Sequence, residues 1–317
     1  MSYRYIIQRL YFLRKTSNNL KKNNYDRIIL ENHSTLFLAL KWHKNYIKYK
    51  DKYYYHIHNE IKSFYGCENI IKNTKKILCV SNYIKKQVEN FFGIQDSKNI
   101  VKLTNCINID EFKEISEKEK ISLKKKYNIE KDEKVILFAG RLSNEKGIRE
   151  LLLAIRGIKN VPKFKLLVVG SFFFDTEVKN SFEEELRSII KEIKDKVIFT
   201  GYVKHEDMYK IYGMSDIAAL PSLWEDPAPL TIIEAMSSGL PIVTTDSGGI
   251  PEYAKNDCAY IIKRDENLIK NIKEKLEELL NSEAQRKKMS EISLKNAKEL
   301  NLKNFYNNLL KDIDIDL

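Results

Sequence analysis

The sequence predicts an α/β protein with two domains, each built on an open sheet of parallel strands. Short apolar runs rich in Ile, Val, Leu and Tyr recur along the chain, and segments with helical periodicity separate them. The length of 317 residues is sufficient for two domains of ordinary size. Polar residues follow several of the predicted strands, and ligands of parallel α/β sheets bind at this edge.

Strands and helices are expected to alternate through the first half. Strands are predicted at 27–31, 53–58, 76–81 and 101–104, and helices at 1–25, 35–48, 68–74 and 82–92. The strongly charged stretch 110–132 indicates a solvated helix or a linker at the domain junction. We therefore expect an N-terminal Rossmann-like domain over 1–118.

The second half repeats this alternation more regularly. Strands are predicted at 134–139, 165–170, 197–200, 217–220, 241–244 and 259–262, and helices at 146–158, 177–193, 206–212 and 230–238. Beyond residue 264 the pattern is helical, at 266–280, 283–299 and 302–309. We expect a second domain over 119–300, followed by a helix and tail over 301–317 that return to the first domain.

The formal charge of +11 has two interpretations. It can attract the chain to an anionic membrane or a phosphorylated acceptor, or it can reflect a composition rich in Lys, Asn, Ile and Tyr. Within 1–25, apolar residues beside Arg and Lys favour a peripheral membrane role, although such a helix can equally pack on a sheet. No apolar run reaches the ~18 residues of a membrane span, and no secretory signal opens the chain. We expect a cytoplasmic protein with reduced cysteines and no nucleic-acid partner.

The stretch 221–239 is the strongest candidate for a binding site. A strand ends at Leu220, Pro227 and Pro229 stiffen the loop that follows, and a helix begins at Leu230. Backbone N–H groups at such a helix start favour a phosphate. Glu234, one turn further on, places a carboxylate where it can hold a polyol such as ribose. These features together predict a sugar-nucleotide site.

A second junction between strand and helix, at 135–148, supplies two cations. Gly140 makes a tight turn, and Arg141 and Lys146 stand in the loop before the next helix. Two cations and a helix N-terminus can stabilise a diphosphate without a metal ion. Either cation alone would be an ordinary loop charge, so this interpretation depends on the loop at 224–234 lying close by.

Two other groups contain residue types that bind metals. We expect only one of His56 and His58 to point to a given face of their strand, and His58, at the strand end, is the better candidate for a pocket. We expect no metal there because no third ligand stands at a sensible spacing. The three tail residues Asp312, Asp314 and Asp316 are expected to be a solvated acidic tail. The chain has no G-x-S-x-G elbow, Walker loop or GxGxxG.

With these residues in view, the second half resembles the retaining glycosyltransferases of family 4, which have the two-domain GT-B fold. The matching segments follow the family's order from about residue 135 to the end: FAGRLSNEKGI, LLVVGS, VIFTGYV, MYKIYGMSDIAALPS, EDPAPLTIIEAMSSGLPIVTTDSGGIPEYA and the terminal helices. The first half matches more loosely, through ILENHS, YYYHIHNE, ILCVSNYIKKQ and LTNCINIDEF. The resemblance implies two Rossmann-like domains whose sheets face each other across a cleft.

The resemblance also implies roles for individual residues. Glu234 would hold the ribose hydroxyls, and Asp226 or Glu225 would hold the hydroxyls of the transferred sugar. The diphosphate would be held by Arg141 and Lys146, with N–H groups near Leu230 and Thr231. His58 falls on the histidine that faces the donor sugar. Further residues implied at the donor site are Gly140, Ser171, Val203 and Pro229.

The sequence departs from the family at the first of the paired acids, at its opening, and at the family's Asn-Gly-Val-Asp turn, which appears here as Asn105-Cys106-Ile107-Asn108 without its glycine. The first of the family's paired acids is Asp226 here, one carbon shorter than Glu, and the neighbouring Glu225 could supply the missing reach. The chain also opens with a predicted helix and has no glycine before Gly66, so we expect the usual first strand and Gly-rich loop of the family to be missing. We interpret this as a missing gene start, a reduced acceptor domain or a degenerate enzyme.

The sequence therefore predicts a metal-independent, retaining glycosyltransferase. It would move a hexose from a nucleoside diphosphate sugar, with UDP favoured over GDP, to a glycan or lipid-linked acceptor of the cell surface. The reaction would take place at the cytoplasmic face of the membrane, and no catalytic nucleophile is assigned. One alternative is a non-catalytic subunit that binds a sugar nucleotide or a partner chain. Another is an epimerase, which would need acid/base groups such as His33, His56 and His58.

Overall fold

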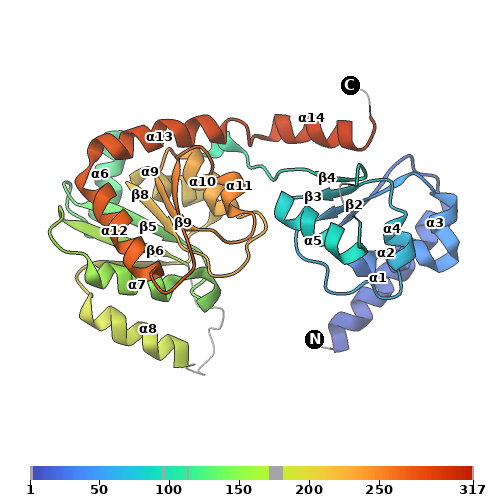
Figure 1. Ribbon diagram of the computed structural model, residues 1–317, viewed down its shortest axis with the longest axis horizontal. Helices are drawn as coiled ribbons and strands as arrows, with labels where there is room; N and C mark the ends of the chain where they lie inside the picture. Colours follow the sequence, from blue (N-terminus) through green and yellow to red (C-terminus); the bar gives the residue numbers. More distant parts are fainter. Residues whose placement is uncertain (1–2, 95–96, 113, 171–180, 316–317) are drawn as a thin grey trace. The chain divides into compact units, whose positions relative to one another are not determined.

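The computed structural model describes residues 3–94, 97–112, 114–170 and 181–315. The chain divides into two compact units, one formed by residues 1–105 with 305–317 and the other by residues 106–304. Each unit is an α/β structure with a sheet of parallel strands (Figure 1). The predicted fold class, with two Rossmann-like α/β domains, is confirmed.

The first unit holds a four-stranded sheet in the order β1-β2-β3-β4. Its strands are β1 (Ile28–Glu31), β2 (Tyr53–Ile57), β3 (Ile77–Cys79) and β4 (Ile100–Lys102). Every residue of β2 is buried. This agrees with a central parallel strand that is covered on both faces of the sheet. The side chains on each face are then apolar or hydrogen-bonded.

Among the described residues before β4, five helices and two short 3-10 turns precede or connect these strands. They are α1 (Tyr3–Lys22), η1 (Ser34–Leu36), α2 (Phe37–Lys41), η2 (Trp42–Lys44), α3 (Asn45–Lys48), α4 (Glu68–Lys72) and α5 (Asn82–Phe92). The single helix predicted at 35–48 is wrong, because His43 and Lys44 adopt φ angles of 57° and 55°. The Ser17 hydroxyl of α1 donates to the Trp42 carbonyl at 3.2 Å, and this side-chain bond replaces one that a continuous helix would make.

The end of the chain packs on the first unit. Helix α14 (Leu302–Asp312) and the residues after it place Leu310 and Ile313 against Tyr54 and Leu78 of the sheet. The Tyr54 hydroxyl donates to the Ile313 carbonyl at 3.0 Å. Asp314 is exposed, as a solvated acidic tail predicts, but it is also paired: its carboxylate lies 2.7 Å from the Lys75 ammonium and 2.9 Å from that of Lys76. Asp316 lies outside the described residues.

We expect Asp314→Asn to weaken this attachment. Hydrogen bonds from Lys75, and then from Lys76, lower the pKa of Asp314 from 3.8 to about 2. The ion pairs therefore stabilise the fold above about pH 4, and their contribution disappears as the pH falls through 2. Because Asp314 is partly exposed, the loss at pH 7 should be at most about 1 kcal/mol. Urea unfolding at pH 7 and pH 3 should show a smaller difference at pH 3, with the exposed Asp26→Asn as control. An Asp314→Asn variant with the same free energy of unfolding as the wild type at pH 7 would contradict a stabilising role for these ion pairs.

The second unit holds a six-stranded sheet in the order β10-β9-β8-β5-β6-β7. Its strands are β5 (Lys134–Ala139), β6 (Phe164–Val169), β7 (Val197–Gly201), β8 (Ile217–Leu220), β9 (Ile242–Thr245) and β10 (Ala259–Ile262). The chain starts at β5, builds β6 and β7 on one side, and then crosses to β8 on the other side of β5. The strand order therefore reverses between β5 and β8, which is where doubly wound sheets bind their ligands.

Helices cover both faces of this sheet (Figure 1). They are α6 (Glu117–Lys126), α7 (Ile148–Gly157), α8 (Ser181–Glu192), α9 (Met208–Met214), α10 (Leu230–Ser237), α11 (Ile250–Tyr253), α12 (Leu268–Asn281) and α13 (Glu283–Ala297). Alternate residues of β5 enter different cores: Ile136 and Phe138 pack with α7, α8 and α12, whereas Val135 and Leu137 pack with α9 and α10. The first residues of the helix predicted at 177–193 lie outside the described chain.

No helix among the described residues combines the length and the apolar character needed to cross a bilayer.

Candidate functional site

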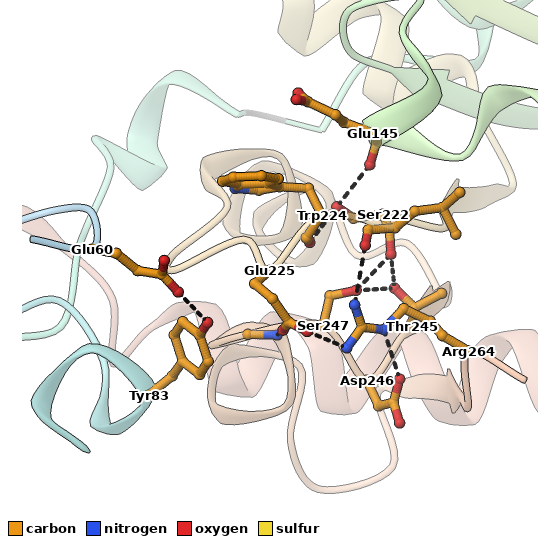
Figure 2. A network of polar contacts seen from close by, with 12 residues as sticks. Glu60, Tyr83, Glu145, Ser222, Trp224, Glu225, Thr245, Asp246, Ser247 and Arg264 are labelled. Atoms are coloured by element: carbon orange, nitrogen blue, oxygen red, sulfur yellow. Dashed lines mark hydrogen bonds and ion pairs between the residues drawn. The ribbon is translucent and has the colours of Figure 1, made fainter. Parts of the chain in front are cut away.

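The loops after β5 and β8 lie side by side at the point where the strand order reverses. The backbone N–H groups of Leu223 and Trp224 donate to the Glu145 carbonyl at 2.8 and 3.0 Å (Figure 2). Gly147, with φ of 68°, permits this approach, because a Cβ atom there would stand 1.8 Å from the Pro221 carbonyl oxygen. The predicted proximity of the two loops is therefore present in the structure.

A small cavity of about 50 Å³ opens between these loops. Its lining joins the β5 end, the β8 end and the start of α10, through Phe138, Ala139, Gly140, Lys146, Leu220, Ser222, Asp226, Pro229, Thr231, Ile232 and Ile250. Five of the residues expected at a donor site thus meet here: Gly140, Lys146, Asp226, Pro229 and Thr231. The cavity combines one cation, one carboxylate and the N-terminus of a helix, which suits an anionic ligand that also carries hydroxyl groups.

Lys146 and Asp226 form an ion pair across the cavity. The Lys146 ammonium lies 2.7 Å from the Asp226 carboxylate, and the two side chains are only 27% and 13% exposed. The pair links the cation expected at the diphosphate to the acid expected at the sugar. A phosphate that enters here would share the three N–H bonds of Lys146 with Asp226. Lys146 is therefore held in place before any ligand arrives.

A polar network around Glu225 holds the loop that also carries Asp226 (Figure 2). Arg264 donates to the Glu225 carboxylate at 2.6 Å, to the Leu223 carbonyl at 3.0 Å and to the Asp246 carboxylate at 3.2 Å. The Glu225 carboxylate also accepts the Gly248 N–H at 2.5 Å. Glu225 is thus engaged with the loop after β9, whereas Asp226 faces Lys146. This arrangement favours Asp226 over Glu225 as the residue that meets a sugar.

Two small hydroxyl side chains hold the same loop at its start. Thr245 and Ser247 both donate to the Ser222 carbonyl, at 2.5 and 2.6 Å, and all three residues are buried (Figure 2). Gly249 adds a backbone bond of 2.8 Å to the Asp226 carbonyl. Because these bonds come from the loop after β9, the acid-bearing loop is positioned by two strand ends rather than by its own sequence.

Arg141 and the α10 N-terminus flank the cavity. The Arg141 guanidinium is half exposed and lies 3.5 Å from the Glu145 carboxylate, and the residue is outside the cavity lining. Pro229 caps α10 without a side-chain hydrogen bond to the helix. The first N–H groups of a helix have no partner within it. Those near Thr231 therefore remain able to bind an anion, while the Leu230 side chain is exposed.

Glu234 lies one turn into α10 and is almost fully buried. One carboxylate oxygen accepts a hydrogen bond of 2.8 Å from the Tyr212 hydroxyl, and the other lies 3.8 Å from the imidazole of the exposed His205. Burial raises the pKa of Glu234, although the bond from Tyr212 and the charge of His205 oppose this effect. Glu234 itself does not line the cavity, and the oxygen on the His205 side is the one expected to meet a ribose hydroxyl.

We expect Glu234→Gln to stabilise the fold while it weakens nucleotide binding. Because the pKa of Glu234 is raised on folding, its charge destabilises the folded state above the ordinary pKa of 4.5, and this cost disappears below that pH. Gln keeps an acceptor for Tyr212 but is a weaker acceptor for ribose, so UDP affinity should fall about tenfold. Denaturant unfolding at pH 7 and calorimetric titration with UDP would check both effects. Unchanged UDP affinity would remove Glu234 from the site.

Among the described residues of the second unit, the expected site residues Arg141, Glu225, Leu230, Glu234 and Val203 do not line the cavity. Val203 follows β7 and packs against the core on the α9 side of the sheet. Ser171 lies outside the described residues.

His58 belongs to the first unit, where Glu31 joins it. The Glu31 carboxylate lies 3.1 Å from both His56 and His58. The expectation that only one histidine points to a given face is wrong, since residues two apart on a strand share a face, and the two ring centroids are 4.2 Å apart. The expectation that no third ligand accompanies them is also wrong, because Glu31 supplies one from the neighbouring strand.

Several contributors to these sites were missed from the sequence, among them Glu31, His205, Tyr212 and Arg264. Arg264 follows β10 and meets Glu225 from a distance of 39 positions. Tyr212 stands in the segment MYKIYGMSDIAALPS, and its position one strand before the acidic loop was a usable signal. Glu31 could have been found as a charged residue at the carboxyl end of a predicted strand, the edge of the sheet where ligands bind.

Comparison with known proteins agrees with this geometry. The family of glycosyl transferases group 1 matches residues 119–296. The spore coat protein SA of Bacillus subtilis is 35% identical over 162 residues, which are 50% of this chain and 43% of that protein. The chain spans about half the length of the curated relatives it matches.

Solved structures show the same fold. A glycosyltransferase from Rickettsia africae ESF-5 superposes with a TM-score of 0.77 at 21% identity, covering 96% of this chain and 80% of that one. Anabaena Alr3699/HepE, solved in complex with UDP, gives a TM-score of 0.75 at 16% identity and covers 95% and 81%. The fold is therefore GT-B, as predicted. The chain belongs to the group 1 glycosyl transferases.

Proposed function

We propose that this chain transfers a hexose from a nucleoside diphosphate sugar, without a metal ion and with retention of the anomeric configuration. The observation that carries the proposal is the cavity where the strand order reverses, in which Lys146, Asp226 and the α10 N-terminus meet. UDP is the proposed nucleotide because a similar fold, HepE, was solved with UDP. The motifs shared with retaining glycosyltransferases of family 4 support retention.

In this proposal, different residues of the second unit bind different parts of the donor. Lys146, Arg141 and the N–H groups near Thr231 bind the diphosphate and stabilise the negative charge that grows as it departs. Glu234 accepts hydrogen bonds from the ribose. Asp226, already paired with Lys146, accepts hydrogen bonds from the transferred sugar, so Lys146 links the departing phosphate to the sugar end. His58 is proposed to contact the sugar from the first unit.

The proposed acceptor is a glycan or lipid-linked hydroxyl in cell-surface polysaccharide synthesis, at the cytoplasmic face of the membrane. Helix α1 supports a peripheral association. Its 20 residues include six Arg or Lys and no acid. Only Leu13, Ser17 and Leu20 are buried, while seven large apolar residues of its first half are exposed: Tyr3, Tyr5, Ile6, Ile7, Leu10, Tyr11 and Phe12. Exposed apolar and basic side chains on one helix suit an anionic bilayer surface.

A thermal-shift panel of UDP- and GDP-sugars, with Mg²⁺ and with EDTA, tests the donor proposal. We expect one donor series to stabilise the chain equally in both conditions. If no donor raised the melting temperature, the proposed donor site would be contradicted. Binding without turnover would favour a non-catalytic subunit instead. Where turnover is seen, the anomer of the product, read by proton NMR, decides between retention and inversion.

Sedimentation with vesicles tests the membrane proposal. We expect binding to vesicles that contain phosphatidylglycerol and little binding to neutral vesicles, with the difference suppressed by high salt. Ile7→Glu should abolish it, since the Ile7 side chain is 66% exposed and its replacement leaves the packed half of α1 intact. Equal binding by this variant would exclude α1 as the contact.

A further inference from the structure

Glu31 lies at the carboxyl end of β1 and holds two histidines through a single oxygen. Its partner in the parallel register is His56 of β2. Its Oε2 lies 3.1 Å from Nδ1 of His56 and 3.1 Å from Nε2 of His58. These three side chains form one cluster at the edge of the first sheet where ligands of parallel α/β sheets bind.

The Glu31 carboxylate serves this cluster as an acceptor. Burial opposes its ionisation, but hydrogen bonds from His56 and His58 outweigh this effect and lower the pKa of Glu31 to about 2. An ionised carboxylate can only accept hydrogen bonds. The ring nitrogens that face it must therefore carry protons, so His56 donates from Nδ1 and His58 donates from Nε2.

The two histidines differ in their exposure. His56 is 5% exposed, and its Nε2 is buried without a hydrogen-bond partner among the described residues. The His58 side chain is 37% exposed, and its backbone N–H donates to the Asn32 side chain at 3.3 Å. A neutral imidazole with its proton on Nε2 has a lone pair on Nδ1. His58 is therefore the member of the cluster that can accept a hydrogen bond from a ligand.

We propose that Glu31 is a positioning residue, which holds His58 in the tautomer protonated on Nε2 and so presents Nδ1 as an acceptor for a hydroxyl of the transferred sugar. The proposal rests on the proposed function, in which His58 contacts the sugar. Glu31 itself need not touch the substrate. Without its carboxylate, the proton of His58 would distribute between the two nitrogens and the ring would lose its orientation.

The same three groups are also the ligand types of a zinc site, with their ligand atoms within 4.8 Å of one another. The environment of His56 favours the positioning role. A metal on Nδ1 would force the proton of His56 onto Nε2, where no acceptor stands among the described residues. A buried N–H without an acceptor destabilises the fold. In the hydrogen-bonded cluster, Nε2 of His56 keeps a lone pair, so no N–H group is left buried there without an acceptor.

Nitrogen-15 NMR of the histidine rings tests the tautomer directly in the full chain, which contains five histidines. We expect His58, assigned through His58→Ala, to show a protonated Nε2 and an unprotonated Nδ1 in the wild type. Glu31→Gln should shift its two nitrogens toward a mixture of tautomers, and Glu68→Gln, at an exposed glutamate of the same unit, should not. A His58 spectrum that Glu31→Gln leaves unchanged would overturn the proposal. This reading stands even if no donor is turned over.

A double-mutant cycle tests the link to transfer. We expect Glu31→Gln to lower kcat about tenfold, with little change in UDP affinity because the cluster acts at the sugar end. In a His58→Ala background the same change should have almost no further effect, because Glu31 acts through His58. Additive losses would indicate a merely structural role and overturn the proposal. So would activity that is lost with EDTA and restored by Zn²⁺, because the cluster would then hold a metal.

Discussion

Lys146→Ala is expected to lower kcat/KM at least about 100-fold. The ammonium group lies in the cavity, 2.7 Å from Asp226, and is proposed to meet the diphosphate as negative charge develops on it. Removing one such preorganised donor typically costs 100-fold to 1,000-fold in rate. Steady-state kinetics with the donor identified by the thermal-shift panel would measure the loss.

Two variants separate this effect from side effects. Lys163→Ala removes the same charge from an exposed pair with Glu130 in the same unit, and activity should be retained. Lys146→Ala also leaves the Asp226 carboxylate without its cation, so Lys146→Ala with Asp226→Asn should restore stability but not activity. A folded Lys146→Ala variant within tenfold of wild-type kcat/KM would refute the role of Lys146.

Gly147→Ala is expected to disrupt both the fold and the site. The methyl group would stand 1.8 Å from the Pro221 carbonyl oxygen, and the contact is with backbone that no rotamer change can relieve. The φ angle of 68° adds strain for any residue with a Cβ. We expect a loss of about 3 kcal/mol or more in unfolding free energy, because the loops after β5 and β8 must separate. Donor binding should weaken in parallel, since Lys146 and Asp226 sit on these two loops.

Gly201→Ala is the matched control for this prediction. Gly201 has a similar φ of 70° in the same unit, but nothing stands within 4 Å of the added methyl group. It should therefore cost only the backbone strain, roughly 1–2 kcal/mol. Denaturant unfolding of both variants would isolate the steric contribution at Gly147. Equal losses of unfolding free energy in the two variants would show that Gly147 does not pack against the Pro221 carbonyl as described.

Local sequence patterns were sufficient to predict the fold. All ten predicted strands correspond to β1–β10, because buried parallel strands are continuous apolar runs that composition alone reveals. The helix predicted at 35–48 failed for a tertiary reason. The helix breaks at His43 and Lys44, where Ser17 of α1 binds the Trp42 carbonyl. The hydrophobic pattern within 35–48 contains no information about this contact with another helix.

The site was predictable in its parts but not in its pairings. Proline, glycine and charge patterns identified the loops that hold Lys146 and Asp226. Lys146 and Asp226 are 80 positions apart in the sequence, and Glu225 and Arg264 are 39 positions apart. Both pairings depend on loop conformations that local sequence patterns do not specify. The cluster of Glu31 with His56 and His58 follows from parallel strand register, which a single sequence does not specify.

Calorimetric titration of UDP and GDP into the full chain in EDTA tests the central claim most directly. The account predicts that one of them binds the wild type without a metal, and that the Arg141→Ala, Lys146→Ala double variant binds it at least about 100-fold more weakly. Binding that requires Mg²⁺, or equal affinity in the double variant, would contradict a diphosphate site made by these two cations.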